Sequence, residues 1–179
     1  MVDQLTEMVK DILDTSKIQE KFSDKKDKMY DIKNEVTDIL ENYAMQLAEK
    51  EIYLDVQIPE KLSVCMKEGD FGQVWSNLIS NAVRYTDAGG KITVAADEKM
   101  MWIENTCRPL DEEQLKYIFE PFYRPDETRN IPGGSGLGLY VVREILKKEG
   151  FSYAFEPCED GMRFEIMPDM SMHESGQEA

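Results

Sequence analysis

The 179-residue sequence has one histidine, three cysteines and no long apolar run. The cysteines, Cys65, Cys107 and Cys158, are odd in number and form no Cys-x-x-Cys pair, which argues against a disulfide framework or a zinc site. No segment approaches the ~18 apolar residues that a membrane-spanning helix needs, and no signal peptide is recognisable. We therefore expect a cytoplasmic location, with any membrane contact made through segments that this sequence does not contain.

Basic residues are scarce as well: 21 lysines and arginines stand against 36 aspartates and glutamates, a net charge of -15. Such an acidic chain repels a phosphate backbone, so a nucleic-acid partner is disfavoured. A nucleotide can still bind locally, because a few backbone N–H groups and one arginine act at short range. With 41% hydrophobic residues, the chain has enough apolar surface for one ordinary domain.

The hydrophobic spacing predicts helices interleaved with strands, and consecutive strands that pair as hairpins. This pattern favours a two-layer α/β sandwich with a mixed sheet and an N-terminal helix over a doubly wound parallel sheet. The predicted helices cover residues 1–22, 31–50, 70–84, 111–118 and 137–149. The predicted strands cover residues 52–58, 62–66, 91–96, 100–104, 153–156 and 162–167.

Three regions follow from this pattern. Residues 1–28 are predicted to hold the first helix and a charged linker, residues 29–169 the main domain, and residues 170–179 a polar disordered tail. The first helix either packs on its own domain or pairs with another helix in a coiled coil or bundle.

Asn77 and Asn81 lie one helical turn apart in the predicted helix of residues 70–84, so they share a face. They interrupt an apolar stripe, and a buried amide without a partner costs about 1–3 kcal/mol. An amide oxygen is a suitable Mg²⁺ ligand when phosphates supply the negative charge. The alternative is a hydrogen bond between the two asparagines that serves helix packing alone.

A glycine-rich segment from Gly133 to Gly138 leads into the predicted helix of residues 137–149. Its glycines free the backbone to approach a ligand, and the N–H groups at a helix start face an anion. The segment lacks the Gly-Lys-Ser/Thr of a Walker A loop and does not follow a strand as a Rossmann fingerprint does. A flexible linker is the alternative, although a linker would not run straight into an apolar helix.

Between these motifs, Phe119 and Phe122 flank a Glu-Pro turn. Core packing beneath a loop explains these phenylalanines in part. Arg124 follows at the start of a polar stretch over residues 124–135, which we expect to be a mobile loop. From there the Arg124 cation could reach a γ-phosphate.

In this order and spacing, the three motifs resemble the N, F and G2 boxes of the sensor histidine kinases. That family belongs to the superfamily of gyrase, heat-shock chaperone, histidine kinase and MutL ATPases. The resemblance covers about residues 31–168. It implies an α/β sandwich that binds ATP and Mg²⁺ between the N-box helix and a lid, here residues 124–135.

The resemblance also implies a role for each matching residue. Asn81 would hold Mg²⁺, and Asn77 stands where hydrolytic relatives have a glutamate base. Because an amide cannot take a proton, this favours phosphoryl transfer to a protein over fast hydrolysis. Arg84 and Tyr85 match a basic residue near the phosphates and an aromatic residue near the adenine. The phosphate-binding turn is matched by Gly134, Gly136, Leu137 and Gly138.

One box departs from the family pattern. The family usually has Asp-x-Gly-x-Gly, whose aspartate accepts a hydrogen bond from the adenine amino group, whereas this chain has Asn105-Thr106-Cys107-Arg108-Pro109. The Asn105 side-chain oxygen can still accept that bond, without the charge assistance that makes such bonds roughly twice as strong. This variant resembles vancomycin-resistance-type sensors. A degenerate regulatory module that binds nucleotide weakly is the non-enzymatic alternative.

The position of the single histidine departs further from the family pattern. His173 lies in the predicted tail, whereas the family needs a phosphoacceptor histidine on a dimerising helical hairpin. Residues 1–22 resemble the second helix of that hairpin. We therefore expect a catalytic part of a membrane-anchored, homodimeric sensor kinase, which passes its phosphoryl group to a histidine elsewhere and then to a response-regulator receiver domain. An anti-sigma-factor-type serine kinase is the alternative enzyme.

Overall fold

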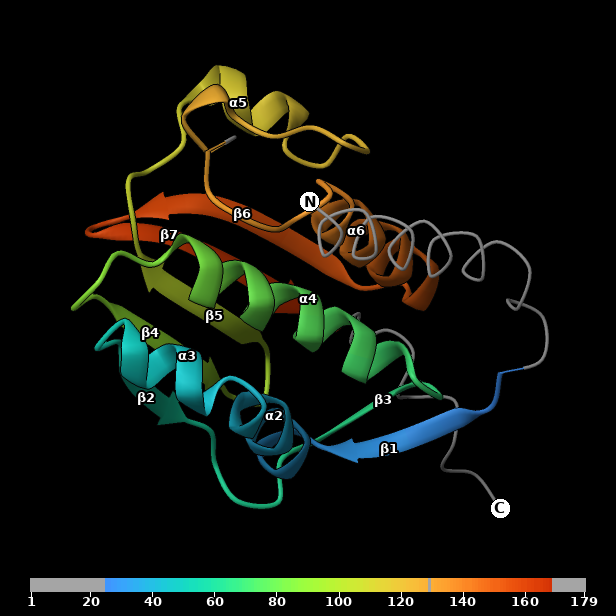
Figure 1. Cartoon of the computed structure of the whole chain (residues 1–179). Coiled ribbons are helices and arrows are strands. Elements are labelled where there is room, and N and C mark those ends of the chain that lie inside the picture. Colours follow the sequence, from blue (N-terminus) through green and yellow to red (C-terminus); the bar gives the residue numbers. More distant parts are fainter. Residues whose placement is uncertain (1–24, 129, 169–179) are drawn as a thin grey trace, which may run out of the picture.

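The computed structural model describes residues 25–128 and 130–168 (Figure 1). The predicted helix over residues 1–22 and the predicted tail over residues 170–179 lie outside these ranges and stay predictions. Within the described ranges, none of the helices has the length and apolarity needed to cross a lipid bilayer.

A five-stranded mixed sheet forms one layer, in the strand order β2-β4-β5-β7-β6. Strand β2 (Tyr53–Gln57) pairs parallel with β4 (Lys91–Ala96), and the other neighbours are antiparallel. The predicted hairpins are β4 with β5 (Met101–Thr106) and β6 (Ser152–Cys158) with β7 (Gly161–Met167). The predicted two-layer sandwich with a mixed sheet is confirmed.

The second layer consists of helices that cover one face of this sheet (Figure 1). They are α2 (Ile32–Glu41), α3 (Ala44–Glu49), α4 (Asp70–Tyr85) and α6 (Gly138–Glu149). Leu78 and Ile79 of α4 and Val142 of α6 are buried against Val94 and Phe164 of the sheet. The short helix α5 (Glu112–Tyr117) lies at one end, beside the loop that leads to α6.

Two elements differ from the sequence prediction. The predicted helix of residues 31–50 is divided into α2 and α3, because the Asn42 side chain bonds back to the Asp38 carbonyl and competes with continued helix. The predicted linker of residues 23–28 lies partly outside the described residues, but from Asp27 the chain forms strand β1 (Asp27–Asp31). Strand β1 pairs antiparallel with β3 (Ser63–Lys67), and an ion pair of 2.7 Å joins Asp27 to Lys67 across this ladder.

Lys50 closes the C-terminal end of α4. Its ammonium group donates to the carbonyls of Val83, Arg84 and Thr86, each at 2.9 Å. Carbonyls of a last helical turn lack partners within the helix, and a cation there also complements the helix dipole. Burial lowers the pKa of the Lys50 ammonium. Lys50 therefore fixes the end of the helix that carries Arg84 and Tyr85.

A carboxyl pair joins the other end of α4 to the end of α6. Asp70 is fully buried, and its Oδ1 accepts from Lys25, while Glu149 accepts the backbone N–H of Lys67 at 3.2 Å. Asp70 Oδ2 is buried without a donor among the described groups, unless the Glu149 carboxyl is protonated and supplies one. Burial, followed by the hydrogen bond with Asp70, raises the pKa of Glu149 to about 7.

Replacing Lys50 by methionine removes three charge-assisted hydrogen bonds while keeping the length of the side chain. We expect the free energy of unfolding to fall by about 1–3 kcal/mol, because three carbonyls lose their donor. Urea denaturation measures the change, and Lys99→Met, at an exposed turn position, is the matched control. Equal stability of the two variants would contradict the capping role of Lys50.

Glu149→Gln should change how stability depends on pH. The pKa of Glu149 lies above its ordinary value of 4.5, so its contribution is fully present below about 4.5 and is lost as pH rises through about 7. Because Glu149 is only half-buried, we expect a loss of about 1–2 kcal/mol in the native protein, and none from this position in the glutamine variant.

Denaturation between pH 5 and pH 8 measures this effect as the stability difference between Glu149→Gln and the native chain. Glu41→Gln, at the exposed end of α2, controls for the loss of one charge. Parallel stability profiles for the native chain and Glu149→Gln would contradict the raised pKa of Glu149.

Candidate functional site

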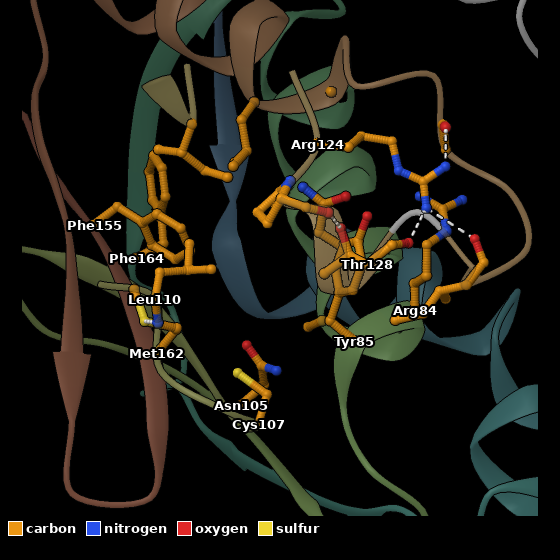
Figure 2. Close-up of a pocket in the computed structure, with 18 of the residues that line it drawn as sticks. Arg84, Tyr85, Asn105, Cys107, Leu110, Arg124, Thr128, Phe155, Met162 and Phe164 are labelled. Carbon is orange, nitrogen blue, oxygen red and sulfur yellow. Dashed lines mark hydrogen bonds between the residues drawn. The ribbon is translucent and has the colours of Figure 1, made fainter. Parts of the chain in front are cut away.

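A cleft of about 310 Å³ lies between α4, the end of β5, the loop before α6 and the start of α6 (Figure 2). Its volume falls within the range of small-molecule sites. Nearly all the predicted site residues line it, namely Asn77, Asn81, Arg84, Tyr85, Asn105, Arg124, Gly134, Gly136 and Gly138. Leu137 does not line the cleft and is instead buried in the core. The fold therefore brings together motifs that are distant in sequence.

The start of α6 packs closely against the asparagine face of α4. A side chain at Gly138 would place its Cβ 3.0 Å from Asn77 Oδ1 and 3.8 Å from Asn81 Nδ2. Asn77 Nδ2 donates to the carbonyl of Gln73 at 2.8 Å. The Asn77 oxygen is thus directed at the N-terminal end of α6, where backbone N–H groups lack partners within the helix. The asparagine helix and the glycine-rich loop, between which a bound nucleotide was predicted, thus lie beside each other.

The glycine-rich loop has a backbone that other residues rarely adopt. Gly134 and Gly136 have φ angles of 82° and 77°, in the left-handed region. A Cβ on Gly136 would also lie 2.8 Å from the carbonyl oxygen of Tyr123, and the Gly136 carbonyl accepts the Phe122 N–H at 3.0 Å. Glycine at position 136 therefore allows the two ends of the loop to touch.

Arg124 holds the backbone of the same loop through hydrogen bonds. Its guanidinium donates to the carbonyls of Gly134 at 3.1 Å and Ile131 at 2.8 Å, and also to that of Thr128 (Figure 2). Thr128 ends a 3-10 turn in the loop, η1 (Asp126–Thr128). In this structure the Arg124 side chain holds loop backbone, and its predicted approach to a γ-phosphate stays a prediction.

Arg84 reaches the same part of the loop from α4. A Cβ on Gly134 would lie 2.8 Å from Arg84 Nη1, so the absence of a side chain lets the guanidinium lie against the loop backbone. The guanidinium groups of Arg84 and Arg124 therefore both lie beside Gly134 (Figure 2). This end of the cleft concentrates positive charge in a strongly acidic chain, which suits an anionic ligand.

The two phenylalanines of the middle motif have different environments. The Phe119 ring packs edge-on to Tyr153, with centroids 5.3 Å apart, and also contacts Phe155 and Phe164. This cluster fixes α5 against β6 and β7, and both Phe155 and Phe164 line the cleft. Core packing thus explains Phe119, whereas Phe122 is 56% exposed and has a φ of 65°.

The variant turn begins at Asn105, on the face of β5 that Met101 and Ile103 direct into the core. Cross-strand pairing places Asn105 opposite Met162. A Cβ on Gly161 would lie 1.9 Å from the Asn105 carbonyl oxygen. The family turn has glycines where this chain has Cys107 and Pro109. Here the glycine that lets two backbone segments come close together is instead Gly161, on the neighbouring strand.

The rest of the turn is held from the same hairpin. The Cys107 N–H donates to the Asp160 carbonyl at 3.2 Å, and the Leu110 N–H points at Met162 Sδ at 3.4 Å. Burial raises the pKa of the Cys107 thiol, so it stays protonated at neutral pH. Sequence reasoning missed both Gly161 and Lys50. A glycine at the start of a strand was a signal for a close backbone approach, whereas Lys50 gave none.

Comparisons with known proteins show the family of the chain. Residues 66–172 match the family described as histidine kinase-, DNA gyrase B-, and HSP90-like ATPase. The sensor histidine protein kinase HK06 of Streptococcus pneumoniae is 32% identical over 165 residues, which cover 92% of this chain and 37% of that protein. This chain therefore spans little more than a third of the length of that relative.

Solved structures show the same fold. The histidine kinase AdeS of Acinetobacter baumannii superposes with a TM-score of 0.74 at 23% identity, covering 94% of this chain and 80% of that one. Full-length ShkA in complex with AMPPNP gives a TM-score of 0.73 at 24% identity, covering 93% and 36% respectively. At these identities the likeness concerns the fold alone.

Gly161→Ala should be costly, because the added methyl group would overlap the Asn105 carbonyl in a paired strand. We expect a loss of about 1–3 kcal/mol in the free energy of unfolding. Gly72→Ala is the matched control, since a Cβ there meets nothing within 4 Å in the interior of α4 and should be neutral or stabilising. Thermal and urea denaturation of both variants measure the difference, and equal stability would show that β7 can retreat without cost.

Proposed function

Because the chain belongs to the family of histidine kinase-, DNA gyrase B-, and HSP90-like ATPases, we propose that its cleft binds ATP with Mg²⁺ and presents the γ-phosphoryl group to a histidine. The observation that carries this proposal is the close packing of Gly138 on Asn77 and Asn81. It places the amide oxygen of Asn77 and the side-chain amide of Asn81 beside the N–H groups that begin α6.

The phosphate end of the nucleotide belongs at the glycine-rich loop. Backbone N–H groups at the start of α6, next to the positive-φ glycines Gly134 and Gly136, form an anion site. The Arg84 guanidinium adds a full positive charge there. Asn81 is the residue that would hold Mg²⁺, since its amide oxygen is a hard ligand and the phosphates supply the charge. The bound cation would neutralise charge on the phosphate oxygens during transfer.

The side chains around the reacting phosphate favour transfer over hydrolysis. Asn77 stands on the cleft face where a base would have to activate water, and a carboxamide cannot take a proton. The contribution of the chain is then to position the γ-phosphoryl group and to stabilise its charge. Arg124 contributes by holding the loop backbone through the carbonyls of Thr128 and Ile131.

The acceptor that we propose lies on helices beyond the described residues. His173 is the sole histidine of the sequence and lies outside the described ranges. HK06 supports a histidine acceptor, because this relative, 32% identical to the chain, is named as a sensor histidine protein kinase. The proposal therefore includes a dimerising hairpin in the parent protein and a response-regulator receiver domain as the next acceptor. The parent would be membrane-anchored, with this domain on the cytoplasmic side.

Titration with a non-hydrolysable ATP analogue tests the proposed site. We expect roughly micromolar binding in the presence of Mg²⁺ and at least about tenfold weaker binding without it. Asn81→Ala should remove the Mg²⁺ dependence, because the proposed ligand is lost. Asn34→Ala, at an exposed position of α2, is the matched control and should bind as the native chain does.

Calorimetry gives the dissociation constants for each variant. Absence of binding at millimolar nucleotide would overturn the proposed function and favour a degenerate module. If the chain binds ATP, incubation with a separate helical hairpin that carries a histidine decides the acceptor. Acid-labile phosphate on the hairpin supports the histidine kinase, and acid-stable phosphate on a serine protein would indicate the anti-sigma-factor type instead.

A further inference from the structure

A side-chain amide, that of Asn105, lines the cleft at its inner end. Asn105 Nδ2 is buried and has no hydrogen-bond partner in the part of the chain that the structure describes. Buried polar groups of native proteins are almost always paired, so an orphaned donor on a residue that lines a ligand-sized cleft points to a partner that a turn of the amide would bring within reach, namely a ligand. Asn105 lines the cleft together with Ile103, Leu110, Met162 and Phe164 (Figure 2).

These neighbours make the surroundings of the Asn105 amide apolar. Ile103 precedes it on the inward face of β5, Met162 lies opposite it on β7, and Phe164 lies opposite Ile103. A flat heteroaromatic ring fits such walls, and hydrogen bonds to its edge are strong when water is excluded. The amide is therefore placed to read the edge of a base.

The backbone of Asn105 is fixed, whereas its amide can turn. The Asn105 carbonyl lies against Gly161, and the pairing of Asn105 with Met162 fixes the register of β5 against β7. The terminal torsion of an asparagine side chain has a broad, roughly two-fold preference. Rotation about that bond exchanges an acceptor for a donor at the same place in the cleft.

Resting on the proposed nucleotide site, we infer that Asn105 makes the cleft tolerant of 6-oxopurine as well as 6-aminopurine nucleotides. With a 6-aminopurine, Asn105 Oδ1 accepts from the amino group. With a 6-oxopurine, the now unpaired Nδ2 donates to the ring oxygen, and Oδ1 accepts from the ring N1–H. A carboxylate at this position would present acceptors only and would repel the 6-oxo oxygen.

The experiment compares the dissociation constants of Mg·ATP and Mg·ITP, two nucleotides that differ at the 6-position of the base. For the native chain we expect the two constants to agree within about tenfold. Asn105→Asp should raise the preference for ATP over ITP by at least about tenfold, because the donor is lost and a repulsive charge is added. Asn34→Asp makes the same chemical change at an exposed position and should leave the ratio as in the native chain.

A second variant covers the case in which a buried carboxylate prevents folding. Asn105→Leu keeps the shape of the side chain and removes both hydrogen-bonding groups, so ATP and ITP should both bind about tenfold more weakly. Thermal unfolding checks that each variant is folded. A native preference for ATP as large as that of Asn105→Asp, or unchanged binding of both nucleotides by Asn105→Leu, would overturn this inference alone. Failure of the native chain to bind either nucleotide would overturn the proposed function and the inference with it.

Discussion

The contact between the start of α6 and the middle of α4 determines where the rest of the cleft can lie. Gly138 has no side chain, so the first turn of α6 comes close enough for its missing Cβ to fall 3.0 Å from Asn77 Oδ1. A side chain at position 138 would make tight contact with the Asn77 side chain, so that either Asn77 or the helix start would have to shift. Because α6 begins where the glycine-rich loop ends, this contact also sets the position of Gly134 and Gly136. The loop then meets Arg84 on the same helix as the asparagines.

The elements around this contact are fixed at both ends. Lys50 holds the last carbonyls of α4, next to Arg84, and the Asp70–Glu149 pair joins the first turn of α4 to the last turn of α6. The aromatic cluster around Phe119 holds the segment that precedes the loop. The loop between these supports is held chiefly by the Arg124 guanidinium. A rigid floor with a separately fastened loop is the arrangement expected of a site that must admit and release its ligand.

The layer architecture and most of the residues that line the candidate cleft could be predicted from the sequence, because the relevant signals are local. Asn77 and Asn81 are one turn apart on an apolar helix, and the glycines precede a helix start. Each motif can therefore be recognised from the spacing of its own residues. The contacts that hold α4 and the loop in place could not be predicted, since they join residues that are distant in sequence. Lys50 resembles any surface lysine until the end of α4 is placed beside it. Strand β1 was hidden by charges that are paired across the ladder with β3.

The role of Arg124 shows a further limit of sequence reasoning. An arginine beside a glycine-rich loop is expected to point at an anion, yet both terminal nitrogens of the Arg124 guanidinium here donate to loop carbonyls. The family pattern likewise indicates that Asn105 belongs to the site, but only the strand pairing reveals that Gly161 provides the space behind it. Composition sets the chemistry of such a site, whereas tertiary packing decides which atoms remain available to a ligand.

The central claim is that the asparagines of α4 and the glycine-rich loop form one nucleotide site. Nuclear magnetic resonance titration with Mg²⁺ and a non-hydrolysable ATP analogue tests it most directly. The account predicts that the side-chain amide signals of Asn77 and Asn81 and the backbone amide signals of Gly134, Gly136 and Gly138 shift together, with a single midpoint, while the exposed Asn34 side chain does not respond. Shifts of the asparagines without the glycines, separate midpoints, or changes confined to another surface would contradict it.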